Sequence, residues 1–365
     1  MSFRNQRKNL MRVRGNPEVV LHVGQPKTGT SVIQRFCVGN RRFLERHGYF
    51  YPPHPIDKNG VSAGHGAIYR GLHKGAPDPR EIFLNHLKEA KSHNCKLLLS
   101  SELFWNTLDT LVPLLRDFDF AIVALFRHPT DRTVSSYNQA VKRSFYTKNF
   151  QSFLSYLETQ GLNQHILLEN WINTVGAERI IANPYQKSLL LQTGMAAAFL
   201  NILNIRPPAS LFKHRSDVLN SSYLPEYLEL KRMLNLILDK NDKGTNLKID
   251  WILQKASDRY NTCHVKNQEK QIFKIDADSY RKLDAESTAF AAQLSRLMTR
   301  MPESEVVFEQ GEQVQTTNLA QRVQALDFSE VTPLIRQRIA LAQNRSHLPP
   351  DERAQLILLD KLFPE

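Results

Sequence analysis

An apolar run that opens directly into a glycine-bearing loop constrains the fold of this chain more than any other feature. Residues 19–23 read VVLHV, residues 24–31 read GQPKTGTS, and apolar residues then recur at helical spacing. This order predicts a short buried strand, a tight loop and the beginning of a helix. Such a loop gathers backbone N–H groups and the positive end of a helix dipole around one point, which is typical of phosphate and sulfate sites.

The position of the lysine in this loop is unusual. In the common loop that binds nucleoside triphosphates, the lysine directly follows the second glycine. Here Lys27 precedes Gly29, and Thr28, Thr30 and Ser31 place hydroxyl groups on both sides of it. The loop is therefore predicted to bind an anion, but in a way that differs from the standard triphosphate site.

Strand and helix patterns alternate in the first half of the chain, which predicts a parallel sheet with helices on both faces. Strands are expected at 18–23, 49–51, 96–99, 119–126 and 179–182, and helices at 29–39, 41–48, 79–93, 163–175 and 188–203. Beyond residue 145 the pattern is mostly helical, with helices expected at 224–239, 249–260, 279–300 and 332–344. The predicted fold is an α/β, P-loop-like parallel sheet flanked by helices, with a mostly helical C-terminal subdomain.

Three regions are expected along the chain. Residues 1–17 form a basic, disordered tail, residues 18–220 the α/β core, and residues 221–365 a mostly helical region packed on that core. Within the core, residues 54–78 are rich in Gly, His, Pro and Asp and are expected to form a long loop, a feature that is often functional.

Composition narrows the class of protein. The chain has 365 residues, of which 41% are hydrophobic and 23% charged, as in ordinary globular proteins. No apolar window approaches the length of a membrane span, and the basic N-terminus has no apolar segment typical of a secretory signal. The three cysteines, Cys37, Cys95 and Cys263, have neither metal-ligand spacing nor the pattern of a disulfide framework. We therefore expect a soluble cytoplasmic protein.

The chain is strongly basic, with a formal net charge of +12. Five basic residues precede the first acid, Glu18, and such a run is usually a solvated segment, although contact with nucleic acid or an anionic membrane is an alternative. No nucleic-acid-binding motif is recognisable. A basic body suits a site for a highly anionic small molecule.

A second candidate motif follows the predicted strand at 119–126. Arg127 stands at the carboxyl end of that strand, where ligands bind in open α/β sheets, and Ser135 lies in the helix that follows. An arginine fork and a serine hydroxyl can hold one phosphate between them, and Arg132, Lys142 and Arg143 add positive charge nearby. Taken alone, this spacing is weak evidence for a phosphate site, because a surface ion pair and a serine at a helix start explain it better.

Together the two motifs resemble those of sulfotransferases that use 3′-phosphoadenosine 5′-phosphosulfate (PAPS), in particular the bacterial and carbohydrate-type members. The resemblance implies that the first loop holds the 5′-phosphosulfate and that Arg127 and Ser135 hold the 3′-phosphate. The residues it implies for donor binding are Gln25, Pro26, Lys27, Thr28, Gly29, Thr30, Ser31, Arg127 and Ser135.

Other motifs of that family are missing. The chain lacks the Lys-Ser-Gly-Thr-x-Trp loop, the Lys-Thr-His strand end and the late Arg-Lys-Gly clamp of the animal and plant cytosolic enzymes. This difference favours a carbohydrate or glycolipid hydroxyl over a phenol or steroid as the acceptor. No metal is expected.

The expected chemistry needs a cation at the leaving oxygen and a base for the attacking hydroxyl. Lys27 is the predicted cation. Glu102, at the end of the strand predicted at 96–99, is the first candidate for the base. The alternative is a helix-start residue capped through Ser100 or Ser101, and the two roles are compatible. His65 is the second candidate, followed by His54.

Two other functions fit parts of the sequence. A P-loop nucleotide kinase or NTPase would share the anion loop, but the lysine is displaced and no strand ends in an aspartate clearly placed for Mg²⁺. A non-catalytic basic anion-binding protein would account for the charge alone. The sequence leaves the acceptor and the oligomeric state open.

Overall fold

The computed structural model describes residues 10–54, 64–66, 68, 78–159, 164–185, 194–208, 223–267, 271–299, 301–302, 304, 306–310, 323–345 and 347–364. The first nine residues of the predicted tail, most of the predicted loop at 54–78 and part of the helix predicted at 188–203 lie outside these ranges. By its internal contacts the chain divides into two compact units. Unit 1 comprises Met1–Arg132, Asn163–Asp217 and Ala285–Glu303, and unit 2 comprises Thr133–Leu162, Val218–Asp284 and Ser304–Glu365.

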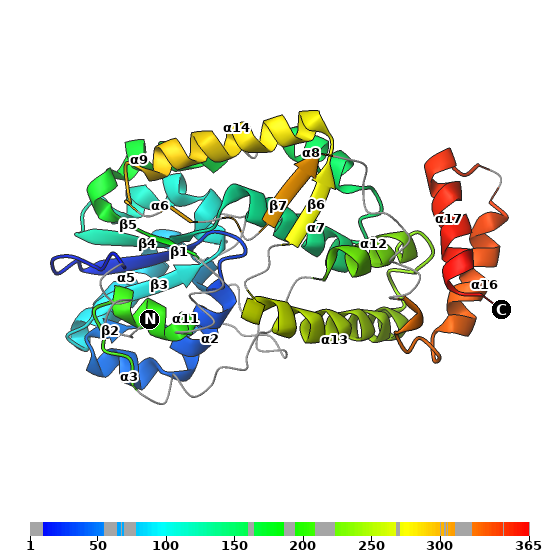
Figure 1. Ribbon diagram of the computed structural model, residues 1–365. Coiled ribbons are helices and arrows are strands. Elements are labelled where there is room, and N and C mark those ends of the chain that lie inside the picture. Colours follow the sequence, from blue (N-terminus) through cyan, green and yellow to red (C-terminus); the bar gives the residue numbers. More distant parts are fainter. Residues whose placement is uncertain are drawn as a thin grey trace. The chain divides into compact units, whose positions relative to one another are not determined.

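Unit 1 contains a five-stranded parallel sheet with the strand order β2-β3-β1-β4-β5 (Figure 1). Its strands are β1 (Val19–Gly24), β2 (Tyr49–Phe50), β3 (Lys96–Ser101), β4 (Phe120–Phe126) and β5 (Ile180–Pro184). Every residue of β1 and β4 is buried, as expected of parallel strands covered on both faces. The sheet flanked by helices confirms the predicted fold class.

Alternate residues of each strand enter two separate cores, because successive side chains of a strand point to opposite faces. Val20, Leu98 and Val123 lie in one core, together with side chains of three helices. These helices are α2 (Thr30–Gly39), α3 (Arg41–Arg46) and α11 (Met195–Ile202). Leu21 and Ile122 lie in the other core, with side chains of α5 (Pro79–Ser92), α6 (Leu108–Leu115), α9 (Gln164–Val175) and α14 (Ala277–Leu294).

Unit 2 is mostly helical and has its own apolar core. Its helices include α8 (Phe150–Thr159), α12 (Pro225–Leu234), α13 (Lys243–Asn267), α16 (Thr332–Gln343) and α17 (Pro350–Leu362). It also contains a two-stranded parallel sheet of β6 (Gln271–Ile275) and β7 (Val306–Gln310), which the sequence reading did not predict. Two helices, α7 (Pro129–Ser144) and α14, contribute residues to both units.

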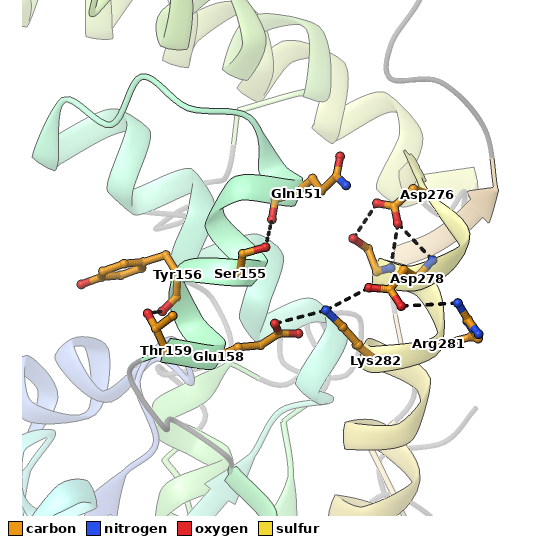
Figure 2. Close-up of polar contacts among 10 residues, drawn as sticks. Gln151, Ser155, Tyr156, Glu158, Thr159, Asp276, Asp278, Arg281 and Lys282 are labelled. Carbon is orange, nitrogen blue, oxygen red and sulfur yellow. Dashed lines mark hydrogen bonds and ion pairs between the residues drawn. The ribbon is translucent and has the colours of Figure 1, made fainter.

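The N-terminal part of α14 is tied to α8 by polar side chains (Figure 2). Lys282 Nζ contacts Glu158 Oε2 of α8 at 3.2 Å and Asp278 Oδ2 at 2.9 Å. Asp276 caps the helix, because its Oδ1 accepts from the backbone N–H groups of Asp278 and Ser279. The Ser279 hydroxyl, which donates to Oδ2 at 2.6 Å, lowers the pKa of Asp276 most, and the backbone hydrogen bonds lower it further. The cap therefore fixes where α14 begins, two residues before the predicted start.

Candidate anion-binding and active site

The candidate site residues follow three neighbouring strands. The loop from Gln25 follows β1, Glu102 follows β3 and Arg127 follows β4, and β1 lies between the other two strands. All three strands run parallel, so their carboxyl ends meet at one edge of the sheet. The chain first builds the sheet on one side of β1 and then on the other, and such a switch point is where open α/β sheets bind ligands.

A tight turn presents Lys27. The backbone N–H of Thr28 donates to the carbonyl of Gln25 at 3.2 Å, and the Thr28 hydroxyl donates to the same oxygen at 2.6 Å. Pro26 takes the second position of this turn, and Lys27, at the third, has a φ of 73°. Pro followed by a residue of positive φ is the arrangement of a type II turn, where glycine is usual. A lysine there costs on the order of 1 kcal/mol, and such strain clusters at functional sites.

Helix α2 begins directly after this turn. Gly29 precedes it with a φ of 76°, and the first turn of the helix, which the structure describes in full, contains no acidic residue and no side-chain cap. The N–H groups of Thr30 and Ser31 have no acceptor within the helix, because the first turn of any helix leaves its donors free. A positive dipole end without an internal counter-charge suits an anion.

Glu102 lies beside Lys27. Desolvation raises the pKa of the Glu102 carboxyl, although solvent reaches the residue. The charge of Lys27 and a hydrogen bond from its backbone N–H lower the pKa by less, so the net shift is upward. The short helix that follows, η3 (Leu103–Asn106), is capped by Ser101, whose Oγ accepts from the Leu103 N–H at 3.2 Å. The Glu102 carboxylate is therefore not used as the cap.

Arg127 is tied to the same loop. Its backbone N–H donates to Gln25 Oε1 at 2.7 Å, and its Nη1 donates to the carbonyl of Lys27 at 3.4 Å. Its guanidinium lies over the ring of Tyr185, 5.5 Å from the centroid. Ser135 lies on the second turn of α7, in unit 2, and its place relative to the loop stays a prediction.

The His65 ring is held inside unit 1 by two hydrogen bonds to the backbone. The ring is buried, Nδ1 accepts from the Ser100 N–H at 2.9 Å, and Nε2 donates to the Pro52 carbonyl at 3.1 Å. Because a backbone N–H can only donate, Nδ1 is the unprotonated nitrogen. Burial, together with His54 and His86 nearby, lowers the pKa of His65 to about 3. Both ring nitrogens are thus bonded to backbone groups, one in β3 and one in the segment after β2, and a catalytic role for His65 stays a prediction.

Two residues at the site were not anticipated from the sequence. Tyr185 follows β5, and its N–H donates to the Phe126 carbonyl at 2.7 Å, which brings its ring to Arg127. The rule that ligands bind at strand ends could have found it. Met195 begins α11 and lies against Gly29, where an added Cβ would be 2.4 Å from the Met195 Cε. No local signal in the sequence points to Met195.

Two further features are missing from the described part of the chain. There, no three His, Cys, Asp or Glu side chains gather in a way that could hold a metal ion. Among the same residues, no helix combines the length and the apolar character needed to cross a membrane.

Comparison with known proteins gives matches among solved structures only. No protein-family model matches the chain, and no curated protein matches it. A sulfotransferase from Alicyclobacillus acidocaldarius is similar with 13% identity and a TM-score of 0.39, over 78% of this chain and 94% of that one. The sulfotransferase domain of the olefin synthase from Synechococcus PCC 7002 is similar with 14% identity and a TM-score of 0.34, over 58% and 84% of the two chains. Because both TM-scores are below 0.5, we draw the function from the residues of the site.

Proposed function

We propose that the protein is a sulfotransferase that moves a sulfuryl group from PAPS to an acceptor hydroxyl. One observation carries this proposal: a strained turn presents Lys27 next to a carboxylate, Glu102, directly before a helix N-terminus. A cation, a base and a set of anion-binding N–H groups then meet at one sheet edge. Sulfuryl transfer, like phosphoryl transfer, requires this combination of positioning and charge stabilisation.

Lys27 and α2 act on the donor. The Lys27 ammonium neutralises the charge that grows on the bridging oxygen as the bond from sulfur to the 5′-phosphate breaks. The N–H groups of Thr30 and Ser31 hold phosphate and sulfate oxygens, and Gly29 lets the backbone come close to them. Arg127 grips the 3′-phosphate, for which the resemblance also implies Ser135.

Glu102 is the proposed general base, in preference to His65. Its carboxylate takes the proton of the acceptor hydroxyl while that oxygen attacks sulfur, and adenosine 3′,5′-bisphosphate leaves. The raised pKa of Glu102 supports this role, because a carboxylate becomes a stronger base as its pKa rises.

We propose a carbohydrate or glycolipid hydroxyl as the acceptor, since the motifs of the cytosolic phenol and steroid enzymes are missing from the sequence.

The test is transfer of radiolabelled sulfuryl groups from PAPS to a panel of glycans, glycolipids and phenols. Lys27→Ala should lower turnover about 100-fold or more, the usual effect of removing one group that stabilises developing charge. Lys27→Gly is the matched variant, because it removes the same charge but suits the positive φ. An effect shared by both variants therefore comes from the charge and not from the backbone.

Calorimetry of adenosine 3′,5′-bisphosphate without Mg²⁺, and of ATP with Mg²⁺, separates the alternatives. Tight binding of adenosine 3′,5′-bisphosphate supports sulfuryl transfer. A preference for Mg-ATP, or near-normal turnover of Lys27→Ala with PAPS, would contradict it.

A further inference from the structure

Gln25 joins the Lys27 loop to Arg127, which lies 102 residues further along the chain. Its side chain is completely buried, and its Oε1 accepts the Arg127 N–H at 2.7 Å. Its Nε2 is also buried, and among the described residues it has no hydrogen-bond partner. Burying an amide whose Nε2 has no partner costs free energy. Gln25 keeps its bond to Arg127 in spite of this cost.

This geometry gives Gln25 a role that differs from contact with the donor. One end of its amide is occupied by Arg127 and the other is enclosed by protein, so the side chain holds protein groups together. The bond connects the first residue after β4 to the first residue after β1. A second link, from Arg127 Nη1 to the Lys27 carbonyl at 3.4 Å, ties the arginine to the turn itself.

We propose that Gln25 is a positioning residue that sets the distance between the Lys27 loop and Arg127, and so makes the site selective for nucleotides with phosphates at both the 3′ and the 5′ position. This inference rests on the proposed function. A ligand that reaches both groups benefits from a fixed spacing, because less conformational freedom is lost on binding. A nucleotide with a 5′-phosphate alone uses the loop and gains nothing from the fixed Arg127.

Nucleotide selectivity tests this role. The dissociation constants of adenosine 3′,5′-bisphosphate and adenosine 5′-monophosphate are measured by calorimetry for the wild type, Gln25→Met, Arg127→Ala and the double variant. Methionine keeps the length of glutamine but has no oxygen to accept the Arg127 N–H. We expect Gln25→Met to weaken bisphosphate binding about tenfold, the effect of about one buried hydrogen bond, with little change for the monophosphate. In the double variant, Gln25→Met should weaken bisphosphate binding no further than Arg127→Ala alone does.

Two more variants guard against a general loss of structure. Gln34→Met removes another buried amide of the same unit, one whose Nε2 donates to the Ser100 carbonyl at 3.5 Å, and should keep the wild-type selectivity. Gln25→Asn is shorter by one carbon, so its oxygen no longer reaches Arg127, and it should lose selectivity as Gln25→Met does.

The outcomes separate this inference from the proposed function. Equal weakening of both nucleotides by Gln25→Met, or an additive loss in the double variant, would overturn the positioning role alone. A wild-type protein that binds neither nucleotide would overturn the proposed function and this inference together.

Discussion

Lys27 occupies a backbone position that usually belongs to glycine. With φ values of 73° and 76° at Lys27 and Gly29, the chain turns sharply twice between β1 and α2. The order of lysine before glycine thus has a physical consequence, because it puts the charged side chain on the turn and the glycine at the helix start. The strain at Lys27 is compatible with folding because the turn is closed by two bonds from Thr28.

The pH dependence of turnover distinguishes the two candidate bases. A base acts only when it is deprotonated, so the rate should rise with pH through the raised pKa of Glu102 and then level off. Glu102→Gln should lower the rate about 100-fold or more and remove this acidic limb. His65→Ala should keep the limb in whatever protein folds. Loss of the limb in His65→Ala and its survival in Glu102→Gln would assign the base to His65.

At the scale of elements, the segment from β1 through the loop to α2 is the part of the chain in which local sequence and structure agree best. The observed strand, Val19–Gly24, begins and ends one residue later than predicted, and the helix, Thr30–Gly39, begins one residue later and ends where predicted. Agreement is close because both signals are local: a run of apolar residues for a strand buried on both faces, and glycine at the helix start.

Two glycines at opposite ends of α2 should respond to alanine in opposite ways. Gly29→Ala forces a Cβ onto a backbone with φ of 76°, and against Met195, so it should destabilise the protein by about 1–2 kcal/mol. Gly39→Ala meets no atom within 4 Å and should stabilise by up to about 1 kcal/mol, because alanine restricts the unfolded chain. Urea unfolding measures both. Equal effects of the two substitutions would contradict the strained helix start.

At the scale of the whole molecule, the strands of unit 1 were predicted from the sequence and those of unit 2 were not. The parallel sheet of unit 1 has apolar strands separated by helices, a pattern that is visible locally. The sequence between β6 and β7 of unit 2 contains α14, so their pairing depends on a contact between distant segments. The helices α6, α8 and α17 were also not predicted individually. The proposed domain boundaries at 18–220 and 221–365 stay a prediction.

Two buried histidines should make unit 1 sensitive to acid. Burial lowers the pKa of both His22 and His65 to about 3, whereas unfolded histidine titrates near 6.5. The unfolded chain therefore binds more protons between these values, and stability should fall as the pH drops below about 6.5, by about 1.4 kcal/mol per pH unit for each histidine.

Fluorescence can follow this transition. Trp105 and Trp171 are buried in unit 1, while Trp251, in unit 2, is 62% exposed, so a change in tryptophan emission reports mainly on unit 1. The urea midpoint should be lower at pH 5.5 than at pH 7.5, and His22→Gln should reduce the difference by about half. An unchanged midpoint in the wild type would contradict the neutral, buried state of these rings.

The sequence by itself determined the glycine-bearing loop at 24–31, the strand in front of it, and Arg127 at a second strand end, because each depends on residues that are neighbours along the chain. Only the tertiary structure showed that both ring nitrogens of His65 bond to backbone groups, and only it revealed the bond from Gln25 to Arg127. The physical reason is the same in each case. The partners of His65 are the backbone groups of Pro52 and Ser100, and the partner of Gln25 lies on another strand, so burial and hydrogen bonding between distant segments set what each side chain can do.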